Sequence, residues 1–369
     1  MPAILCLNGP NLDRLGTRDP AVYGDWTLSR LEEQVIKWGS ELGLDVVCHQ
    51  SNHAGSLIEA IHAGDADGIV INPGGLTHSS PSLADAVASV PVPVVEVHLS
   101  NVRARDRWRR RSYISGPAVT SIVGRGPEGY RAALRHLVNR WDWPVETIRY
   151  GPHPDHVIDV RKTSKAAMSA ILIHGGFWLD AWGRDLVDGW AVDLARRGVA
   201  TAAIEYRRTP SGGGAVATTS DVVVAIDAGL GVLETTDHVV IGHSAGAHLA
   251  AWAASCRPLR PSLTVAISGI FDLAGADAAG VGGGAVSSFD PSHLTSPVGL
   301  PPPATPIALI HAQGDSVVPV AQSQAYHDHL LGQGADVSLD LVPGGHFDCL
   351  DTTSSTWAAV IDRLVPGVT

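Results

Sequence analysis

The first 140 residues alternate between short apolar stretches and longer amphipathic ones. The apolar stretches predict strands at Ala3–Leu7, Leu44–His49, Gly68–Ile71, Val92–Val97 and Thr120–Val123. Between them, apolar residues recur at helical spacing, which predicts helices at Leu28–Leu42, Ser56–Ala63, Ser82–Ala88 and Gly129–Val138. Strands that are each separated by one helix form right-handed βαβ units, so this half predicts a parallel sheet.

Five strands with four intervening helices fit a small flavodoxin-like sheet. The stretch Trp141–Thr147 then interrupts the pattern at Pro144, which indicates a linker. A second series of strands is predicted at Val157–Val160, Ala170–His174, Ala200–Glu205, His238–Ile241, Leu263–Ile267, Ile307–His311 and Val337–Leu341. The two halves do not resemble each other. We therefore expect an N-terminal α/β domain at 1–143, a linker at 144–149 and a different α/β domain at 150–369.

The composition narrows the class of protein. Of the 369 residues, 45% are hydrophobic and 17% are charged, so a core of ordinary size can be buried. No apolar run approaches the roughly 18 residues of a membrane span, and no leader pattern precedes the first strand. The net charge of -11 disfavours nucleic acid and anionic membranes as partners. Four separated cysteines without a CxxC pair fit a reducing compartment, so we expect a cytoplasmic protein.

Polar residues gather where the predicted strands of the first half end. Asn8-Gly9-Pro10-Asn11 follows the first strand, Gln50-Ser51-Asn52 the second, and Asn72-Pro73-Gly74-Gly75 the third. The turn preference of Asn and Gly explains each segment taken alone. Ligands bind outside the carboxyl ends of parallel strands, however, so several such ends on one edge favour a binding site.

Two pairs of residues in this half suit proton transfer. Glu96 and His98 lie two apart on one strand and share a face, where a carboxylate fixes the imidazole tautomer and raises its basicity. The alternative is a structural pair in the core. Arg18 and Tyr23 lie on a loop from Gly16 to Gly24. Forming a tyrosinate at pH 7 costs roughly 4 kcal/mol, which a nearby guanidinium offsets, although a loop tyrosine is more often a packing residue.

These segments resemble type II 3-dehydroquinate dehydratase over about residues 3–140. The matching motifs are LNGPNLDRLGTRDPAVYG, QSN, INPGGLTHSS, EVHLSNVRARDRWRRRS and IVGRGPEGY. The family eliminates water from 3-dehydroquinate through an enolate, without a metal or an organic cofactor. The resemblance implies that Tyr23 is the base, with its pKa lowered by Arg18, and that Asn11 holds a water at the enolate. It also implies that His98, oriented by Glu96, protonates the departing hydroxyl.

The resemblance also implies a substrate-binding set. Its members are Asn72, Gly74, His78, Asp85, Leu99, Ser100 and Arg109. Asp85 matches a family residue that reaches a neighbouring subunit, which implies a homo-oligomer built from trimers, up to a dodecamer. Arg109 gives a role to one member of the basic run Arg103–Arg111, which otherwise suits a solvated helix face. Lys37, the sole lysine of this half, lies on a predicted helix, which argues against the Schiff-base mechanism of the other dehydratase class.

The second half contains the parts of a serine hydrolase. Gly242-His243-Ser244-Ala245-Gly246 follows a predicted strand and precedes a predicted helix, the context in which small neighbours permit a strained turn at a nucleophile. Upstream, His174-Gly175-Gly176-Phe177-Trp178 also follows a strand. We expect the backbone N–H groups of Gly175, Gly176 and Ala245 to form the oxyanion hole.

Asp315 and His346 complete the chain order Ser, Asp, His that this fold uses. Asp272 and Asp348 are rival acids in less suitable positions. Trp178, Trp182 and Phe271 are candidates to line an aromatic pocket, with core packing as the more common explanation.

This half resembles α/β-hydrolases of the HGG(F/Y)W esterase and kynurenine formamidase group, over about residues 148–369. The matching segments are YGPHPDHVIDVRK, HGGFW, GHSAGAHLA, ISGIFDL and HFDCLD. The resemblance implies that Ser244 is the nucleophile, His346 the general base and Asp315 the orienting acid, acting on a small ester or formamide. The short domain leaves little room for a large cap, so a lipase for long chains is not expected.

Together the two halves predict a bifunctional enzyme with small-molecule substrates and no cofactor. One hypothesis is that the hydrolase releases quinate- or shikimate-type acids from esters and so supplies the dehydratase. Another is an N-formylkynurenine amidohydrolase that is merely joined to the dehydratase. A third makes the first half an inert oligomerising scaffold, which the presence of Tyr23, Arg18 and His98 argues against.

Overall fold

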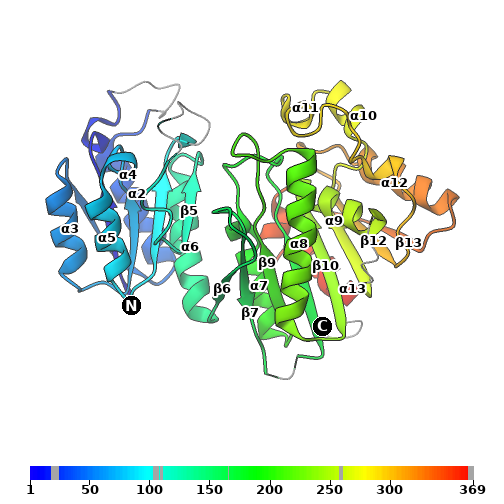
Figure 1. Ribbon diagram of the computed structural model, residues 1–369, viewed down its shortest axis with the longest axis horizontal. Coiled ribbons are helices and arrows are strands. Elements are labelled where there is room, and N and C mark those ends of the chain that lie inside the picture. Colours follow the sequence, from blue (N-terminus) through cyan, green and yellow to red (C-terminus); the bar gives the residue numbers. More distant parts are fainter. Residues whose placement is uncertain (18–24, 103–107, 109–110, 165, 257–260, 365–369) are drawn as a thin grey trace. The chain divides into compact units, whose positions relative to one another are not determined.

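The chain divides into two compact units, Met1–Asp142 and Trp143–Thr369, each with its own sheet and core (Figure 1). A computed structural model describes residues 1–17, 25–102, 108, 111–164, 166–256 and 261–364.

The N-terminal unit is built on five parallel strands in the order β2-β1-β3-β4-β5. The strands are β1 (Ala3–Asn8), β2 (Asp45–Gln50), β3 (Gly68–Asn72), β4 (Val94–His98) and β5 (Thr120–Val123). The helical segments are η1 (Leu12–Arg14), α2 (Leu28–Glu41), α3 (Ala54–His62), α4 (Leu76–Ser79), α5 (Pro81–Ser89) and α6 (Glu128–Asp142). The strand order is that of the flavodoxin-like sheet, so the predicted fold class is confirmed.

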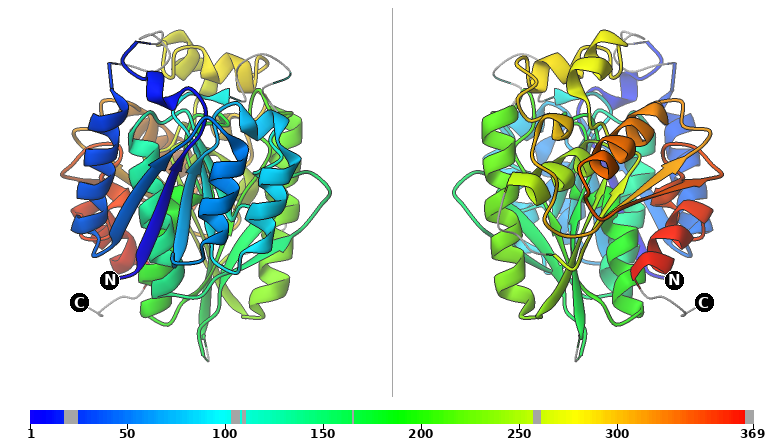
Figure 2. Two further views of the ribbon diagram at one scale, coloured as in Figure 1. Left: turned by 90° about the vertical axis from the view of Figure 1, so that its left-hand side faces the viewer. Right: turned by 90° about the vertical axis from the view of Figure 1, so that its right-hand side faces the viewer.

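Helices cover both faces of this sheet (Figure 2). One apolar cluster joins Ile4 and Cys6 of β1 to α2 and α6, and a second joins Leu7 to α3 and α5. Because successive side chains of β1 point to opposite faces of the sheet, this strand contributes to the apolar clusters on both faces. Two helices start at side-chain caps: Thr27 accepts from the N–H of Arg30, and Ser80 accepts from the N–H of Leu83 with proline at the first helical position.

The C-terminal unit contains eight strands in the order β13-β12-β11-β10-β8-β9-β7-β6. They are β6 (Glu146–Arg149), β7 (Val157–Arg161), β8 (Met168–Ile173), β9 (Ala200–Ile204), β10 (Asp237–His243), β11 (Leu263–Ile267), β12 (Ile307–Ala312) and β13 (Val337–Val342). All neighbours are parallel except at β7, which runs antiparallel to β6 and β9. The strand β6 occupies residues within the predicted linker, where its mostly exposed side chains gave no apolar signal.

The helical segments of this unit again form two layers. They are η4 (Arg184–Val187), α7 (Asp188–Arg196), α8 (Ala215–Leu233), α9 (Ala245–Cys256), α10 (Leu273–Ala278), α11 (Ala285–Phe289), η5 (Pro297–Gly299), α12 (Ala321–Gly332), η6 (Asp348–Leu350) and α13 (Ser355–Leu364). Core clusters pack α8 and α9 on one face of the sheet and α7 and α13 on the other. By length and composition α8 is apolar enough to cross a membrane, which the sequence pattern did not reveal. In this fold Val222, Ala225 and Ile226 bury it against the sheet.

Candidate active sites

In the N-terminal unit, the turns that follow β1 and β3 touch at the carboxyl edge of the sheet. The N–H of Gly9 donates to the carbonyl of Asn72 at 2.8 Å. A Cβ on Gly9 would lie 2.5 Å from the carbonyl oxygen of Pro73, and one on Gly74 would lie 2.8 Å from that of Pro10. Glycine is therefore required where the two turns approach.

On β4, the predicted pair of Glu96 and His98 forms a buried hydrogen bond. Nε2 of His98 donates to Oε1 of Glu96 at 2.9 Å, and the side chains are 5% and 1% exposed. The hydroxyls of Thr77, Ser112 and Ser121 also donate to this carboxylate. Burial raises the pKa of Glu96, but the hydrogen bond and charge of His98, together with the hydrogen bonds from Ser121 and Thr77, lower it to about 2. Glu96 is therefore an anion at neutral pH that fixes the ring of His98.

A second buried network orients two asparagine amides at the same edge. Nδ2 of Asn72 donates to the hydroxyl of Tyr130 at 3.0 Å, and this hydroxyl donates to Oδ1 of Asn8 at 2.7 Å. Oδ1 of Asn72 accepts from the N–H of Gly74 at 3.2 Å. Burial raises the pKa of Tyr130 well above its usual value, so it stays a neutral phenol. Sequence reasoning missed Tyr130, although it ends the last of the quoted motifs.

Other predicted residues of this unit occupy the same edge. The N–H of Asn11 donates to Oδ1 of Asn52 at 2.8 Å, which ties the ends of β1 and β2. Nδ1 of His78 lies 2.6 Å from the carbonyl oxygen of Arg111. The carbonyl of Leu99 accepts from Gly126, and Ser100 is partly buried beside it.

Four predicted residues are not joined to this edge by a described contact. Asp85 is exposed on α5, and no described contact joins it to another candidate. Arg18, Tyr23 and Arg109 lie outside the described residues.

In the C-terminal unit, Ser244 lies on a tight turn between β10 and α9 with φ of 55°. Non-glycine residues rarely adopt such a φ, and strain of this kind is typical of a nucleophile on a strand-to-helix turn; Ser244 itself is 2% exposed. A Cβ on Gly242 would lie 2.2 Å from the carbonyl oxygen of Gly246, and one on Gly246 would lie 2.1 Å from that of Ile173. Both flanking glycines are therefore required by close backbone contacts.

Asp315 is the candidate acid that contacts His346. Its Oδ2 lies 2.6 Å from Nδ1 of His346, and its Oδ1 accepts from the N–H groups of Val317 and Val318 at 2.8 Å. Burial raises the pKa of Asp315, but hydrogen bonds from His311 and His346 outweigh it and lower the pKa far below its usual range. Asp315 is therefore ionised. Its contact with Nδ1 holds the ring of His346 with Nε2 facing away from Asp315.

The rival acids serve local structure. Asp272 accepts from the N–H of Gly275 at the start of α10, and Asp348 accepts from the N–H of Gly345. Among the described hydrogen bonds none joins Oγ of Ser244 to His346. Catalytic hydrogen bonds of this kind are often long until substrate binds.

The loop after β8 lies against the nucleophile turn. A Cβ on Gly175 would lie 3.0 Å from Cβ of Ser244, and Gly176 has φ of 108°. No described hydrogen bond uses the N–H of Gly175 or Gly176. Ala245 begins α9, where the first N–H groups have no acceptor within the helix. Gly175 and Ala245 thus lie next to Ser244, and Gly176 follows Gly175 in the same loop.

Of the three predicted aromatic residues, two belong to the core. Trp178 and Phe271 are fully buried, and Trp178 stacks on Phe289. Trp182 instead lies 6.4 Å, ring centre to ring centre, from Phe347, which is 52% exposed and follows His346. The sequence analysis did not name Phe347, although its position directly after His346 could have indicated that it lies near the proposed base.

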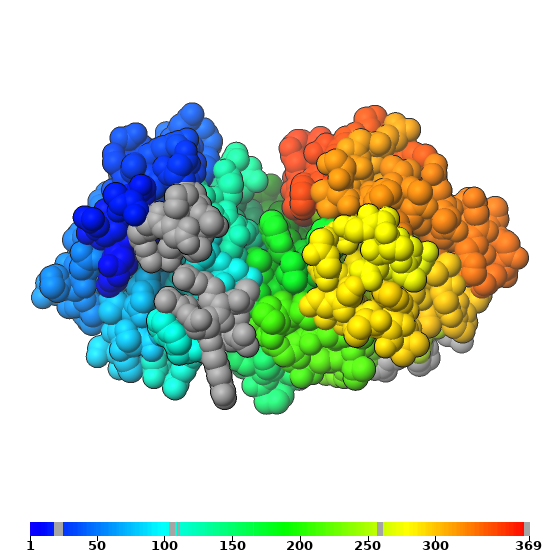
Figure 3. All heavy atoms as spheres, turned by 90° about the horizontal axis from the view of Figure 1, so that it is seen from above, coloured from blue at the N-terminus to red at the C-terminus, as the bar shows by residue number. Residues whose placement is uncertain are grey.

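A further segment contacts the loop after β8. The stretch from α10 to α11 (yellow in Figure 3) lies on the face of the unit seen there. A Cβ on Gly282, within this stretch, would lie 2.6 Å from the ring of Phe177 in the loop after β8. The stretch therefore contacts the loop that carries the candidate oxyanion donors.

Comparisons with known proteins agree with this division. The sequence profile of the family described as dehydroquinase class II matches residues 2–138. The 3-dehydroquinate dehydratase of Anoxybacillus flavithermus is 46% identical over 141 residues, which cover 38% of this chain and 95% of that enzyme. The catabolic 3-dehydroquinase of Talaromyces marneffei is 49% identical over 138 residues, which cover 37% of this chain and 79% of that enzyme.

A structural neighbour covers the other unit. A truncated carbohydrate esterase from gut microbiota matches 59% of this chain and 93% of its own, with a TM-score of 0.50 and 20% identity. This likeness supports the α/β-hydrolase fold and nothing finer. Through its N-terminal unit, the chain belongs to the class II dehydroquinase family, and a second unit with the fold of an esterase is joined to it.

Proposed function

We propose that the chain is a bifunctional enzyme, a 3-dehydroquinate dehydratase joined to a serine hydrolase. In the first reaction, Tyr23 as phenolate takes the C2 proton of 3-dehydroquinate and leaves an enolate. The enolate reforms the ketone as the C1–O bond breaks and His98 protonates the departing hydroxyl, which gives 3-dehydroshikimate and water. The main support is the ionised Glu96 at 2.9 Å from His98, because this hydrogen bond orients the ring for proton transfer.

In the second reaction, Ser244 attacks the carbonyl carbon of a small ester or formamide while His346 accepts its proton. The proton passes to the leaving alcohol or amine, and water then hydrolyses the acyl-enzyme with the same base. The main support is the hydrogen bond of 2.6 Å between Asp315 and His346, together with the strained turn at Ser244. The N–H groups of Gly175, Gly176 and Ala245 are the proposed oxyanion donors.

The proposed substrate of the hydrolase is an ester of a quinate- or shikimate-type acid. Its hydrolysis would release a cyclic acid close to the substrate of the dehydratase, which gives a reason for joining the units. N-formylkynurenine is the alternative substrate. We also propose that the dehydratase units associate into a trimer-based oligomer in the cytoplasm.

Two substitutions test both activities in one chain. Tyr23→Phe should lower dehydroquinate turnover by at least about 100-fold, because the base is lost, and should leave ester hydrolysis intact. Ser244→Ala should abolish hydrolysis and leave dehydration intact, so that each variant controls for the folding of the other. Dehydration is followed by the enone absorbance of the product, and hydrolysis with p-nitrophenyl acetate, an acyl-quinate and N-formylkynurenine. A folded wild-type chain that leaves 3-dehydroquinate unchanged would make the first unit a scaffold.

A further inference from the structure

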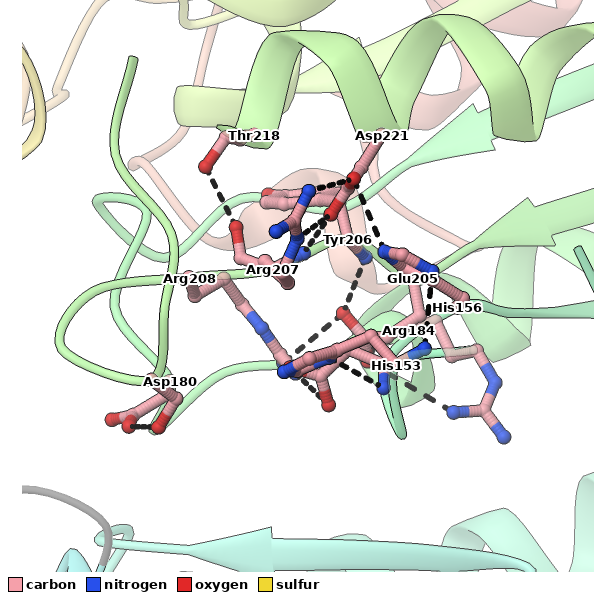
Figure 4. Close-up of polar contacts among 12 residues, drawn as sticks. His153, His156, Asp180, Arg184, Glu205, Tyr206, Arg207, Arg208, Thr218 and Asp221 are labelled. Atoms are coloured by element: carbon pink, nitrogen blue, oxygen red, sulfur yellow. Dashed lines mark hydrogen bonds and ion pairs between the residues drawn. The ribbon is translucent and has the colours of Figure 1, made fainter. Parts of the chain in front are cut away.

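A buried network of charged side chains lies beside the oxyanion loop, by which we mean His174–Trp178. Figure 4 shows part of this network, with Arg184, Glu205 and Arg208 labelled. The network comprises the carboxylates of Asp155, Asp159 and Glu205 and the guanidinium groups of Arg184 and Arg208. Each of these residues is at most 9% exposed. They come from the loop before β7, from β7 itself, from η4 and from the segment after β9. Burying so many charges costs free energy of desolvation unless each charge is paired with an opposite one.

Glu205 is the centre of this network. Its Oε1 accepts from Nε2 of His174 at 2.8 Å and from Nη1 of Arg208 at 3.0 Å. Its Oε2 accepts from the backbone N–H of Arg184 at 3.1 Å. Burial raises the pKa of Glu205, but the charges of Arg208 and His174 lower it far below its usual range. Glu205 is therefore an anion that touches the first residue of the oxyanion loop.

The contacts of His174 indicate that its ring carries both protons. Nε2 faces the carboxylate of Glu205, and Nδ1 lies 2.8 Å from the carbonyl oxygen of Gly175. Both oxygens can only accept, so both ring nitrogens must donate, which makes the ring an imidazolium. The charges agree with this. Nε2 of His174 lies 2.8 Å from a carboxylate that remains ionised, which favours this charge.

Other groups that face His174 do not supply this charge. Tyr206 stacks on the ring with centres 4.4 Å apart, and its hydroxyl donates to the carbonyl of His174 at 2.7 Å. On β10, His243 lies against Gly175, and burial lowers the pKa of His243 to about 3, so it is neutral. Neither side chain supplies a proton donor to Glu205 or to the carbonyl of Gly175 in the described hydrogen bonds, so both of these contacts are made by the ring of His174.

The bond from His174 to Gly175 has a consequence for the oxyanion loop. A peptide unit is planar and trans, so the carbonyl oxygen of Gly175 and the N–H of Gly176 point in opposite directions. Fixing this carbonyl on His174 turns the N–H of Gly176 to the other side of the loop. Gly175 itself lies against Ser244.

We propose that Glu205 is a positioning residue of the hydrolase. It keeps His174 doubly protonated, and His174 in turn holds the carbonyl of Gly175 so that the N–H of Gly176 is presented to the oxyanion formed at Ser244. This inference rests on the proposed serine hydrolase activity for its kinetic effect. The charge of His174 does not depend on that activity and is measured separately.

The charge state is tested by solid-state NMR of the sedimented full-length chain, with ¹⁵N in the histidine rings. In the wild type at pH 8, the spectrum should contain the signal of a histidine with both ring nitrogens protonated that is missing in His174→Gln. In Glu205→Gln the signal of His174 should become that of a neutral ring. A neutral His174 in the wild type at pH 8 would overturn the proposal, whatever the enzyme hydrolyses.

The positioning effect is tested with the isosteric variant Glu205→Gln and p-nitrophenyl acetate. We expect kcat to fall by about 10- to 100-fold, with KM within about twofold, because one oxyanion donor is no longer held. Glu205→Asp, which keeps the charge, should restore part of kcat. Dehydroquinate turnover should be unchanged in all variants.

A matched control separates positioning from general loss of stability. Asp188→Asn breaks another buried ion pair of the same unit, the 2.5 Å contact of Asp188 with Arg161, and neither residue contacts the oxyanion loop in the described structure. This control should lower the melting temperature and leave kcat as in the wild type. If Glu205→Gln behaves in the same way, Glu205 is structural and the inference fails. A wild type without any hydrolysis would instead defeat the proposed function, and the NMR result would then decide the charge of His174.

Discussion

Each unit contains a histidine held by a buried carboxylate, and the two carboxylates remain ionised for different reasons. Glu96 accepts from three hydroxyls besides His98, whereas Asp315 accepts from His311 and two backbone N–H groups besides His346. Side-chain donors can be removed one at a time, but backbone donors cannot. Single substitutions can therefore dissect the environment of Glu96 more fully than that of Asp315.

The ionisation of Glu96 predicts how the stability of the N-terminal unit depends on pH. Folding lowers the pKa of Glu96 from 4.5 to about 2, which corresponds to about 3 kcal/mol of stability. Because the folded pKa is the lower one, this contribution is complete above pH 4.5 and is lost as the pH falls towards 2. Ser121→Ala removes one donor and raises the folded pKa, so the unit should unfold at a higher pH. Hydrogen exchange of peptides that span β4, measured between pH 3 and 7, reports the change.

An exposed serine provides the control for this prediction. Ser29 on α2 also donates to a carboxylate, that of Glu33 at 3.2 Å, but the pair is exposed. Ser29→Ala should leave the pH of unfolding unchanged, because exposed pairs of this kind contribute little. Equal shifts for Ser121→Ala and Ser29→Ala would show that the buried hydroxyl does not hold Glu96 ionised.

How far a site can be predicted depends on how far apart its residues lie in the chain. The pairing of Glu96 with His98 is predictable because residues two apart on a strand share a face. The donor Thr77 is 19 residues from Glu96, and Glu205 is 31 residues from His174. Only the folded sheet brings such residues together, so the sequence alone does not reveal these partners.

At the scale of elements, burial on both sides decides which strands are predictable. Strands such as β3 and β12 are buried along their whole length and appear in the sequence as continuous apolar runs. The edge strand β6 is mostly exposed and has the sequence ETIR, which carries no such run. Short helices such as α4 and α11, of four and five residues, are also too short for helical periodicity to show.

The turn that carries Ser244 depends on the contact between α9 and β8. A Cβ on Gly246 would lie 2.1 Å from the carbonyl oxygen of Ile173 at the end of β8, so Gly246→Ala must push the two elements apart. We expect a lower melting temperature and a large loss of hydrolysis, since the oxyanion loop follows β8. Calorimetry and ester turnover measure the two effects.

Gly231 is the matched control because it also lies in a helix, α8, and a Cβ there would meet nothing within 4 Å. Gly231→Ala should stabilise the chain by up to about 1 kcal/mol, since alanine is the better helix former. Equal melting temperatures for Gly246→Ala and Gly231→Ala would contradict the importance of the close contact.

At the scale of the whole molecule, the apolar clusters divide as the sheets do. Two clusters consist of residues from the N-terminal unit alone, and three of residues from the C-terminal unit alone. A unit with a complete core of its own is expected to fold independently. The fragment 1–142 should therefore retain dehydroquinate turnover, and the fragment 143–369 should retain ester hydrolysis.

The position of the cut provides a sharper test, because β6 lies directly after the boundary at Asp142 and Trp143. The fragment 143–369 keeps β6, whereas 150–369 begins after it and leaves β7 without the partner that runs from Glu146 to Arg149. All five residues of β7 are buried, so its exposed edge would present unpaired backbone groups beside apolar side chains. We expect 143–369 to be monodisperse with the melting temperature of its unit in the full chain, and 150–369 to melt lower and aggregate. Equal behaviour of the two fragments would make residues 143–149 a simple linker, and unfolding of 143–369 would show that this unit needs the dehydratase in order to fold.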